Sequence, residues 1–293
     1  MRWRGERRSA NVEDRRGMRI PRGMALGGGG GCGLLLLLVF GLLLGVDPLQ
    51  LLPLLTTTDQ VPSSPYAGGG SFEPGQADPE DERTLFVSTV LASTEDTWSE
   101  LFSRAGADYD EPTLVLFSDV VDSACGMAES AVGPFYCPTD HKVYIDLAFY
   151  DELRSRFGAP GDFAQAYVIA HEIGHHVQNL LGVSREVQAL ERRLSEAEAN
   201  LLAVRVELQA DCYSGVWAHH AERMRQVLEA GDVEEALGAA SAIGDDRIQR
   251  ESRGYVVPDS FTHGSSAQRQ RWFLTGLESG SLEACDTFSR AEL

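Results

Sequence analysis

The segment AYVIAHEIGHHVQ at residues 166–178 constrains the fold most strongly, because its polar residues act together only on a helix. On a helix, His171 and His175 are four residues apart and project from one face. That spacing lets two imidazole nitrogens bind one zinc ion at about 2 Å each. Glu172 lies beside them and is placed to act as a general base. The segment predicts a buried helix with a zinc site; the alternative is two structural histidines packed against acidic partners.

A zinc site with two histidines needs a third protein ligand. The segment ELQAD puts Glu207 and Asp211 four residues apart on a later predicted helix. We predict that Glu207 is the third ligand and that Asp211 accepts a hydrogen bond from the far nitrogen of a liganding histidine. Two alternatives remain open: Asp211 binds the metal instead, or both acids lie on a solvated helix face.

A second candidate catalytic element is HGSSAQR at residues 263–269, in a loop that enters a helix. His263 could stabilise the oxyanion that develops on a scissile carbonyl group, with Arg269 assisting it or holding the loop. An exposed loop histidine without a function is the alternative. The other histidines are interpreted as structural or surface residues: His141, His176, His219 and His220.

The N-terminal part predicts a membrane anchor. Residues 24–46 contain no charge and are long enough to span a bilayer as a helix. The preceding residues 1–23 carry eight arginines, which favours a cytoplasmic N-terminus and an extracytoplasmic catalytic domain. A cleaved signal peptide is the alternative, although no A-x-A-like cleavage site follows the apolar block. Residues 47–82 are rich in Pro, Gly, Ser and acids and predict a linker, so the folded domain is expected at 83–293.

The charge of the chain excludes one class of partner. The formal net charge is −19, and because residues 1–23 carry +5, the rest of the chain carries −24. A body this acidic would repel phosphate groups, so a nucleic acid is not the expected partner.

The cysteines also favour an extracytoplasmic location, because four of the five lie in the predicted domain and could pair in an oxidising compartment. We prefer Cys125–Cys137, because Gly and Pro between them let the chain fold back, and Cys212–Cys285 then follows by elimination. Four free thiols are the alternative.

Apolar periodicity predicts an α+β domain with a small sheet, early strands and late helices. Helices are expected at 83–105, 148–157 and 163–181, and strands at 113–118 and 142–147. A helical stretch from Ser184 to about residue 230 is expected to break within 197–202. A loop at 257–266 and a last helix at 267–276 complete the prediction.

Several segments give the chain a resemblance to a bacterial family of neutral zinc metallopeptidases. They are MRWRGERRSANVEDRRG, CGMAESAVGPFYCPTDHKVYIDLAFYDEL, AYVIAHEIGHHVQNLLG, ELQADCYSGVWA and THGSSAQRQRWF. This family resembles the gluzincin group of zincins, which implies a zincin-like domain. The resemblance implies zinc on His171, His175 and Glu207, with Glu172 as base and Asp211 behind the ligands. It also implies His263 and Arg269 near the oxyanion.

The resemblance further implies that KVYIDL, residues 142–147, is an edge strand above the cleft to which a substrate peptide could add. The predicted function is a membrane-anchored, zinc-dependent endopeptidase that hydrolyses protein or peptide substrates with a zinc-activated water and a Glu base. One alternative is a zinc-binding, membrane-anchored scaffold or assembly factor with little hydrolytic activity. Another is a structural protein without metal.

Overall fold

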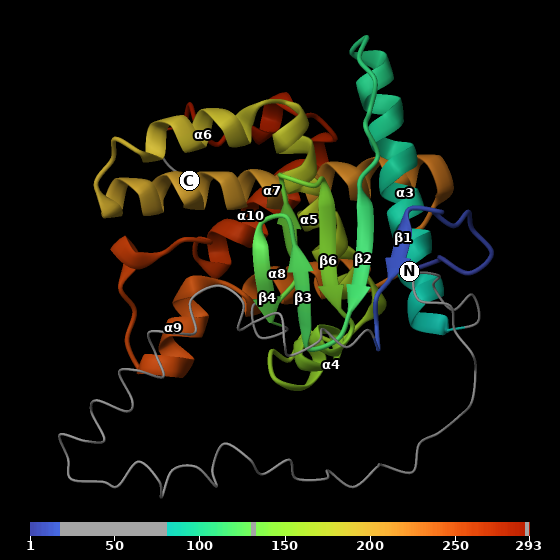
Figure 1. Cartoon of the computed structure of the whole chain (residues 1–293), viewed down its shortest axis with the longest axis horizontal. Coiled ribbons are helices and arrows are strands. Elements are labelled where there is room, and N and C mark those ends of the chain that lie inside the picture. The colour runs from blue at the N-terminus through green and yellow to red at the C-terminus, as the bar shows by residue number, and fades with distance from the viewer. Residues whose placement is uncertain (18–80, 130–132, 291–292) are drawn as a thin grey trace, which may run out of the picture. The chain divides into compact units, whose positions relative to one another are not determined.

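The computed structural model describes residues 1–17, 81–129, 133–290 and 293 (Figure 1). The predicted transmembrane helix at 24–46 and the linker up to residue 80 lie outside these residues. Among the described helices, none has the length and apolar character required to cross a membrane. The described part has the predicted α+β class.

A four-stranded sheet with the order β1-β2-β6-β5 forms the early half of the domain (Figure 1). The bounds are β1 Val12–Asp14, β2 Thr113–Phe117, β5 Phe135–Cys137 and β6 Lys142–Asp146. Strands β1, β2 and β6 are parallel, and β5 is antiparallel to β6. A separate hairpin consists of β3, Val120–Ser123, and β4, Gly126–Glu129.

Both faces of the sheet are buried, which explains why β2 and β6 are rich in apolar residues. Leu114 and Ile145 belong to the main core with the helices. Val115 and Tyr144 belong to a smaller cluster on the other face, together with Val121 of the hairpin. Side chains that alternate along each strand therefore supply both clusters.

The expectation that KVYIDL is an edge strand is wrong. Strand β6 pairs with β2 on one side and with β5 on the other, so its backbone groups are already used. The edge of the sheet on this side is β5, whose three residues gave too short a pattern to be predicted from sequence.

The N-terminal residues are part of the same compact unit as the helices and strands after residue 81. Residues 1–17 and 74–293 form one unit, and β1 pairs directly with β2. Trp3 is buried and packs edge-on against Phe86. Residues 1–17 and 113–117 therefore lie on the same side of any membrane, which differs from the predicted separation of a cytoplasmic segment from an outside domain.

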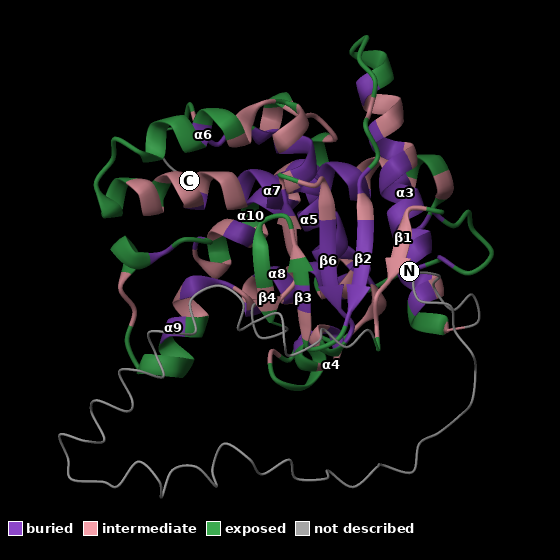
Figure 2. Cartoon of the chain, in the orientation of Figure 1, coloured by how far each residue is buried: buried purple, intermediate pink, exposed green. Residues whose placement is uncertain are grey.

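The helices surround a long central helix, α5, Asp162–Leu180, which packs on α3, Glu82–Arg104, and on two later helices. These are α7, Glu196–Arg225, and α8, Asp232–Ala242. Buried residues are concentrated in β2, β6, α3, α5 and the second half of α7, whereas most of α6 is exposed (Figure 2). The remaining helices are α4, Ala148–Ser155, α6, Val183–Glu191, α9, Asp245–Arg253, and α10, Ser266–Ser279, with 3₁₀ turns at Pro258–Ser260 and Glu283–Cys285.

The expected break in the long helical stretch comes earlier than predicted. Helix α6 ends at Glu191, and α7 begins after Ser195, whose side chain and that of Glu198 form a capping box. This reciprocal cap satisfies backbone groups at the start of a helix and fixes where the helix begins. Helices α8 and α9 were not predicted as separate elements.

Both preferred cysteine pairs are confirmed. Cys125–Cys137 joins the β3–β4 turn to the edge strand β5, with the two Cα atoms 5.8 Å apart. Cys212–Cys285 joins α7 to the C-terminal 3₁₀ turn, with the two Cα atoms 5.6 Å apart.

Candidate metal centre and active site

A close crossing of α5 and α7 brings the two acidic residues of ELQAD to the histidines. The crossing occurs at Gly174, where an added Cβ atom would lie only 3.0 Å from the Cα atom and the carbonyl oxygen of Ala210. A larger side chain would separate the two helices. Gly174 therefore explains why residues 36 and 40 positions apart in sequence meet at one site.

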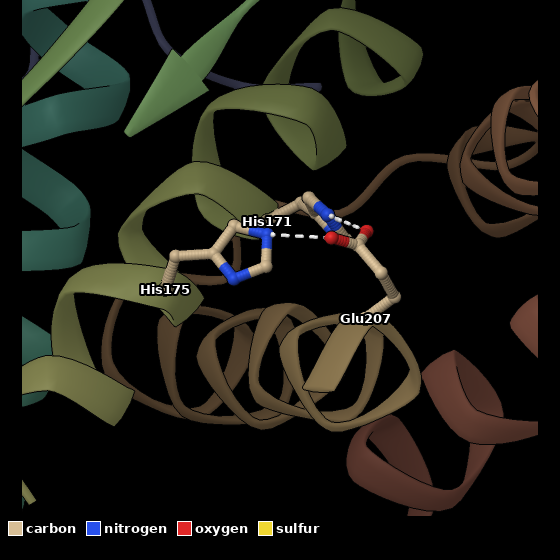
Figure 3. A group of neighbouring side chains, drawn as sticks. All are labelled: His171, His175 and Glu207. Atoms are coloured by element: carbon tan, nitrogen blue, oxygen red, sulfur yellow. Dashed lines mark hydrogen bonds and ion pairs between the residues drawn. The ribbon is translucent and has the colours of Figure 1, made fainter. Parts of the chain in front are cut away.

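Three side chains converge where these helices cross (Figure 3). The Nε2 atom of His171 lies 3.2 Å from one oxygen of Glu207, and the Nε2 atom of His175 lies 3.4 Å from the other. One ligand atom from each residue fits within 4.8 Å of the others. Two imidazoles and one carboxylate match the donor set of catalytic zinc sites, which keep a further position for water or substrate. The residues present therefore fit a zinc ion.

Asp211 holds the first histidine from behind. The Nδ1 atom of His171 lies 2.8 Å from a carboxylate oxygen of Asp211, so this nitrogen carries the proton and Nε2 faces Glu207. The hydroxyl group of Tyr167 donates to the same oxygen. Burial alone would raise the pKa of Asp211, but the charges of Arg269 and His171 lower it. Asp211 is thus a buried anion that lies behind His171, and Glu207 is the acid that faces both histidines.

Arg269 contacts Asp211 and is 2% exposed. Its Nε and Nη2 atoms each lie 2.9 Å from an oxygen of Asp211. A guanidinium group with two hydrogen bonds to one carboxylate fixes the position of that carboxylate. Arg269 thus lies behind His171 and contacts Asp211, where the sequence had suggested that it assists His263 or holds the loop.

We predict that Asp211→Ala strongly lowers stability, because it leaves the buried charge of Arg269 without its partner. Removing one member of a buried ion pair costs about 3–5 kcal/mol. The free energy of unfolding in urea measures this effect. The matched control is Glu100→Ala, which removes an exposed pair with Arg104 on α3 and is expected to cost less than about 1 kcal/mol. Equal effects of the two substitutions would contradict the assignment.

Glu172 lies at the buried end of the site beside the two histidines, and 7% of its surface is exposed. Burial raises the pKa of its carboxyl group, although the nearby histidines oppose this shift. A carboxylate with a raised pKa accepts a proton from water more readily than an ordinary one. Glu172 therefore has the character of a general base.

The candidate metal site opens into a cavity of about 640 Å³. Helix α5 supplies the largest share of its wall, and the segments around β5 and α4, together with α6, α7 and the C-terminal elements, supply the rest. This volume suits a substrate segment with one or more large side chains. The lining includes apolar residues as well as the site residues: Phe135, Phe149, Phe157, Ile243, Ile248, His171, Glu172, His175, Glu207 and His263.

His263 lines this cavity and is held by Asp245, a residue that the sequence analysis did not single out. The backbone N–H groups of Thr262, His263 and Gly264 all donate to one oxygen of Asp245. The other oxygen lies 3.3 Å from the Nδ1 atom of His263. This hydrogen bond raises the pKa of His263, which favours its cationic form. A cation at this place can stabilise negative charge on a substrate oxygen.

His176, which points off the metal face as expected, fixes the edge strand. Its Nε2 atom donates to the carbonyl oxygen of Asp110 at 2.6 Å, so its Nδ1 atom accepts from the hydroxyl group of Tyr136 at 3.0 Å. Tyr136 belongs to β5 and also accepts from Asn179. The two consecutive histidines therefore point in different directions. His175 faces the candidate metal site, and His176 contacts β5, which forms part of the cavity wall.

Sequence reasoning missed three residues that orient the site: Tyr167, Gln178 and Asp245. The first two have a signal in the sequence. Tyr167 precedes His171 by four residues and Gln178 follows His175 by three, so each lies on the metal face of the helix. Asp245 has no such signal, because only the folded chain brings it to the loop around His263.

A sequence profile of the family described as "Putative neutral zinc metallopeptidase" matches residues 1–288. The chain belongs to this family. The match covers the metal-site helices and the N-terminal strand, so the family label applies to the whole described unit. The description of the family implies zinc, and His171, His175 and Glu207 form a group whose geometry could hold such an ion.

Similar proteins occur in Escherichia coli and in Mycobacterium tuberculosis. "Uncharacterized protein YpfJ" of Escherichia coli K12 is 49% identical over 296 residues, covering 99% of this chain and all of that protein. "Uncharacterized protein Rv2575" of Mycobacterium tuberculosis H37Rv is 41% identical over 265 residues, covering 86% of each chain. No solved structure matches the chain.

Proposed function

We propose that this protein is a zinc-dependent endopeptidase that cleaves protein or peptide substrates. The observation that carries the proposal is the convergence of His171, His175 and Glu207 beside Glu172 at a cavity large enough for substrate side chains. When bound there, zinc supplies a Lewis acid that activates water and polarises a carbonyl group. A pure zinc-binding protein would have no use for the buried carboxylate of Glu172.

In the proposed reaction, each of the following side chains has a separate role. Glu172 takes the proton of the attacking water and passes it to the leaving amine. His263, held by Asp245, stabilises negative charge on the oxygen of the scissile carbonyl group. Asp211 keeps His171 in the tautomer that leaves Nε2 free for the metal.

The edge strand suggests how a substrate is held. Strand β5 ends the sheet, and Phe135 and Tyr136 line the cavity. An extended peptide could pair with the free backbone edge of β5 and place a peptide bond over the metal. Such pairing uses the backbone hydrogen-bonding groups of the substrate, which every internal segment of a long chain offers. It therefore favours cleavage within a chain, which is the activity of an endopeptidase.

The proposed location is an extracytoplasmic, oxidising compartment at the cell membrane. The two disulfides support this part of the proposal, because such bonds persist mainly in oxidising compartments. The uncharged segment at residues 24–46 supports contact with a membrane, in an arrangement that keeps residues 1–17 on the same side as the domain.

Metal binding is expected to depend strongly on Glu207. In the purified full-length chain, we predict one zinc ion and cleavage of casein that a chelator abolishes. Glu207→Ala removes one of three ligands and is expected to raise the zinc dissociation constant by more than about 100-fold, beyond the loss caused by removing a residue behind a ligand. Chelator competition and metal analysis measure this change.

Glu196→Ala, the same substitution at an exposed position in the first turn of α7, is the control and should retain zinc. A parent chain that binds no zinc under metal-replete conditions would refute the proposed function. Zinc binding without cleavage of any protein tested would favour the scaffold alternative.

A further inference from the structure

The second histidine of the site has a partner that differs from that of the first. The Nδ1 atom of His175 lies 2.9 Å from the side-chain oxygen of Gln178, one turn further along α5. His171 has the carboxylate of Asp211 in the equivalent place. The two metal-facing imidazoles are thus held by a neutral amide and by an anion, respectively.

The orientation of the Gln178 amide is determined by its other contacts. Its Nε2 atom donates to the carbonyl oxygen of Val206 at 2.7 Å and to the side-chain oxygen of Gln209 at 3.1 Å. A flipped amide would place its oxygen against two acceptors, which is unfavourable. The oxygen of Gln178 must therefore face His175, so the Nδ1 atom of His175 carries the proton, and its Nε2 atom is the one that faces Glu207.

The contacts continue from Gln178 to the C-terminal disulfide. Gln209 donates to the carbonyl oxygen of Cys285 at 3.1 Å, and Cys285 is bonded to Cys212 of α7. Both glutamines are almost fully buried, at 1% exposure for Gln178 and 5% for Gln209. Buried side chains in a satisfied network have little freedom to move, so the network can hold an imidazole in place.

We infer that Gln178 is a positioning residue that fixes the tautomer and orientation of His175 and ties the metal-binding face of α5 to α7 beside Glu207. Gln209 and the Cys212–Cys285 disulfide hold Gln178 in turn. The inference rests on the proposed function, since it concerns the binding of the same zinc ion. It adds that metal affinity depends on two glutamines that do not touch the metal.

The test compares two substitutions of Gln178. Their order of zinc affinity differs according to whether Gln178 positions His175 or only fills space in the core. Gln178→Met keeps the size of the side chain but removes the acceptor for His175. Gln178→Glu keeps an acceptor oxygen for His175 but loses the N–H donor to both Val206 and Gln209. If Gln178 positions His175, the Met variant raises the zinc dissociation constant by about 10–100-fold, and the Glu variant stays closer to the parent. If Gln178 only fills space, the buried charge of the Glu variant is the more harmful change.

The zinc dissociation constant of the full-length chain is measured by chelator competition, and far-UV circular dichroism confirms folding of each variant. Gln165→Met, the same change on the same helix, is the control and should bind zinc like the parent. The visible spectrum of cobalt-loaded protein reports the geometry around His175 and should change in the Met variant. An affinity of the Met variant within twofold of the parent, or a Glu variant weaker than the Met variant, would overturn the inference. A parent chain without zinc affinity would instead refute the proposed function.

Discussion

Glu172→Gln is expected to lower the rate of peptide hydrolysis by about 10²–10⁴-fold and to leave zinc binding unchanged. The amide has the size of the carboxylate but cannot accept a proton from water. Zinc binding should persist, because the three side chains that face one another at the site are His171, His175 and Glu207. The measurements are the rate of casein or fluorogenic peptide cleavage and the zinc content of the same preparation.

The matched control is Glu152→Gln, the same substitution at an exposed position of α4 that also lines the cavity. This variant should retain zinc, and its rate at saturating substrate should be close to that of the parent. A Glu172→Gln variant that hydrolyses peptides at the rate of the parent would show that another group is the base.

Removing residues 1–17 is expected to unfold the catalytic domain, although these residues precede the predicted anchor. The chain from Pro74 to Leu293 would lack β1 and the buried Trp3. It would also lose three partners of Glu95, a carboxylate on α3 that is 1% exposed. Those partners are Arg7, Ser9 and Asn11. A buried carboxylate without partners costs about 3–5 kcal/mol, a large fraction of the roughly 5–15 kcal/mol by which most domains are stable.

The comparison chain keeps residues 1–17 and replaces residues 18–80 with a flexible linker of about ten residues, which can extend over roughly 30 Å. Such a linker can join the two ends, because Arg16 forms an ion pair with Asp81 at 2.6 Å. Urea unfolding and resistance to proteolysis should show a stable domain for this chain and a marginal or unfolded one for Pro74–Leu293. Equal stability of the two chains would mean that the N-terminal segment is dispensable.

The candidate metal ligands were predictable from sequence because their arrangement depends on local geometry. Residues four positions apart on a helix lie on the same face, so His171 and His175 share a face wherever the helix lies in the fold. The same rule predicted that Glu207 and Asp211 share a face. Long amphipathic elements such as α3 and α5 were located correctly for the same reason, since their apolar pattern repeats over several turns.

Short elements and distant pairings could not be read in this way. Strands β1 and β5 have three residues each, too few for an alternating pattern, and they are strands because β2 and β6 offer them backbone partners. The separate positions of Glu207 and Asp211 were predicted from the sequence, but the alternative that Asp211 faces the metal was decided only by tertiary structure. Asp211 became the anion behind His171 because Arg269, 58 residues away in sequence, contacts it.

The sequence by itself determined the chemistry of the site: two histidines and a base on one helix, an acid pair on another, and cysteines that pair. Tertiary structure decided which acid faces His171 and His175, and it brought Gln178 to His175 and Asp245 to His263. It also made the first 17 residues part of the sheet. The reason is that the spacing of residues on a helix is set by its own hydrogen bonds, whereas partners distant in sequence are selected by packing, burial and charge in the folded chain.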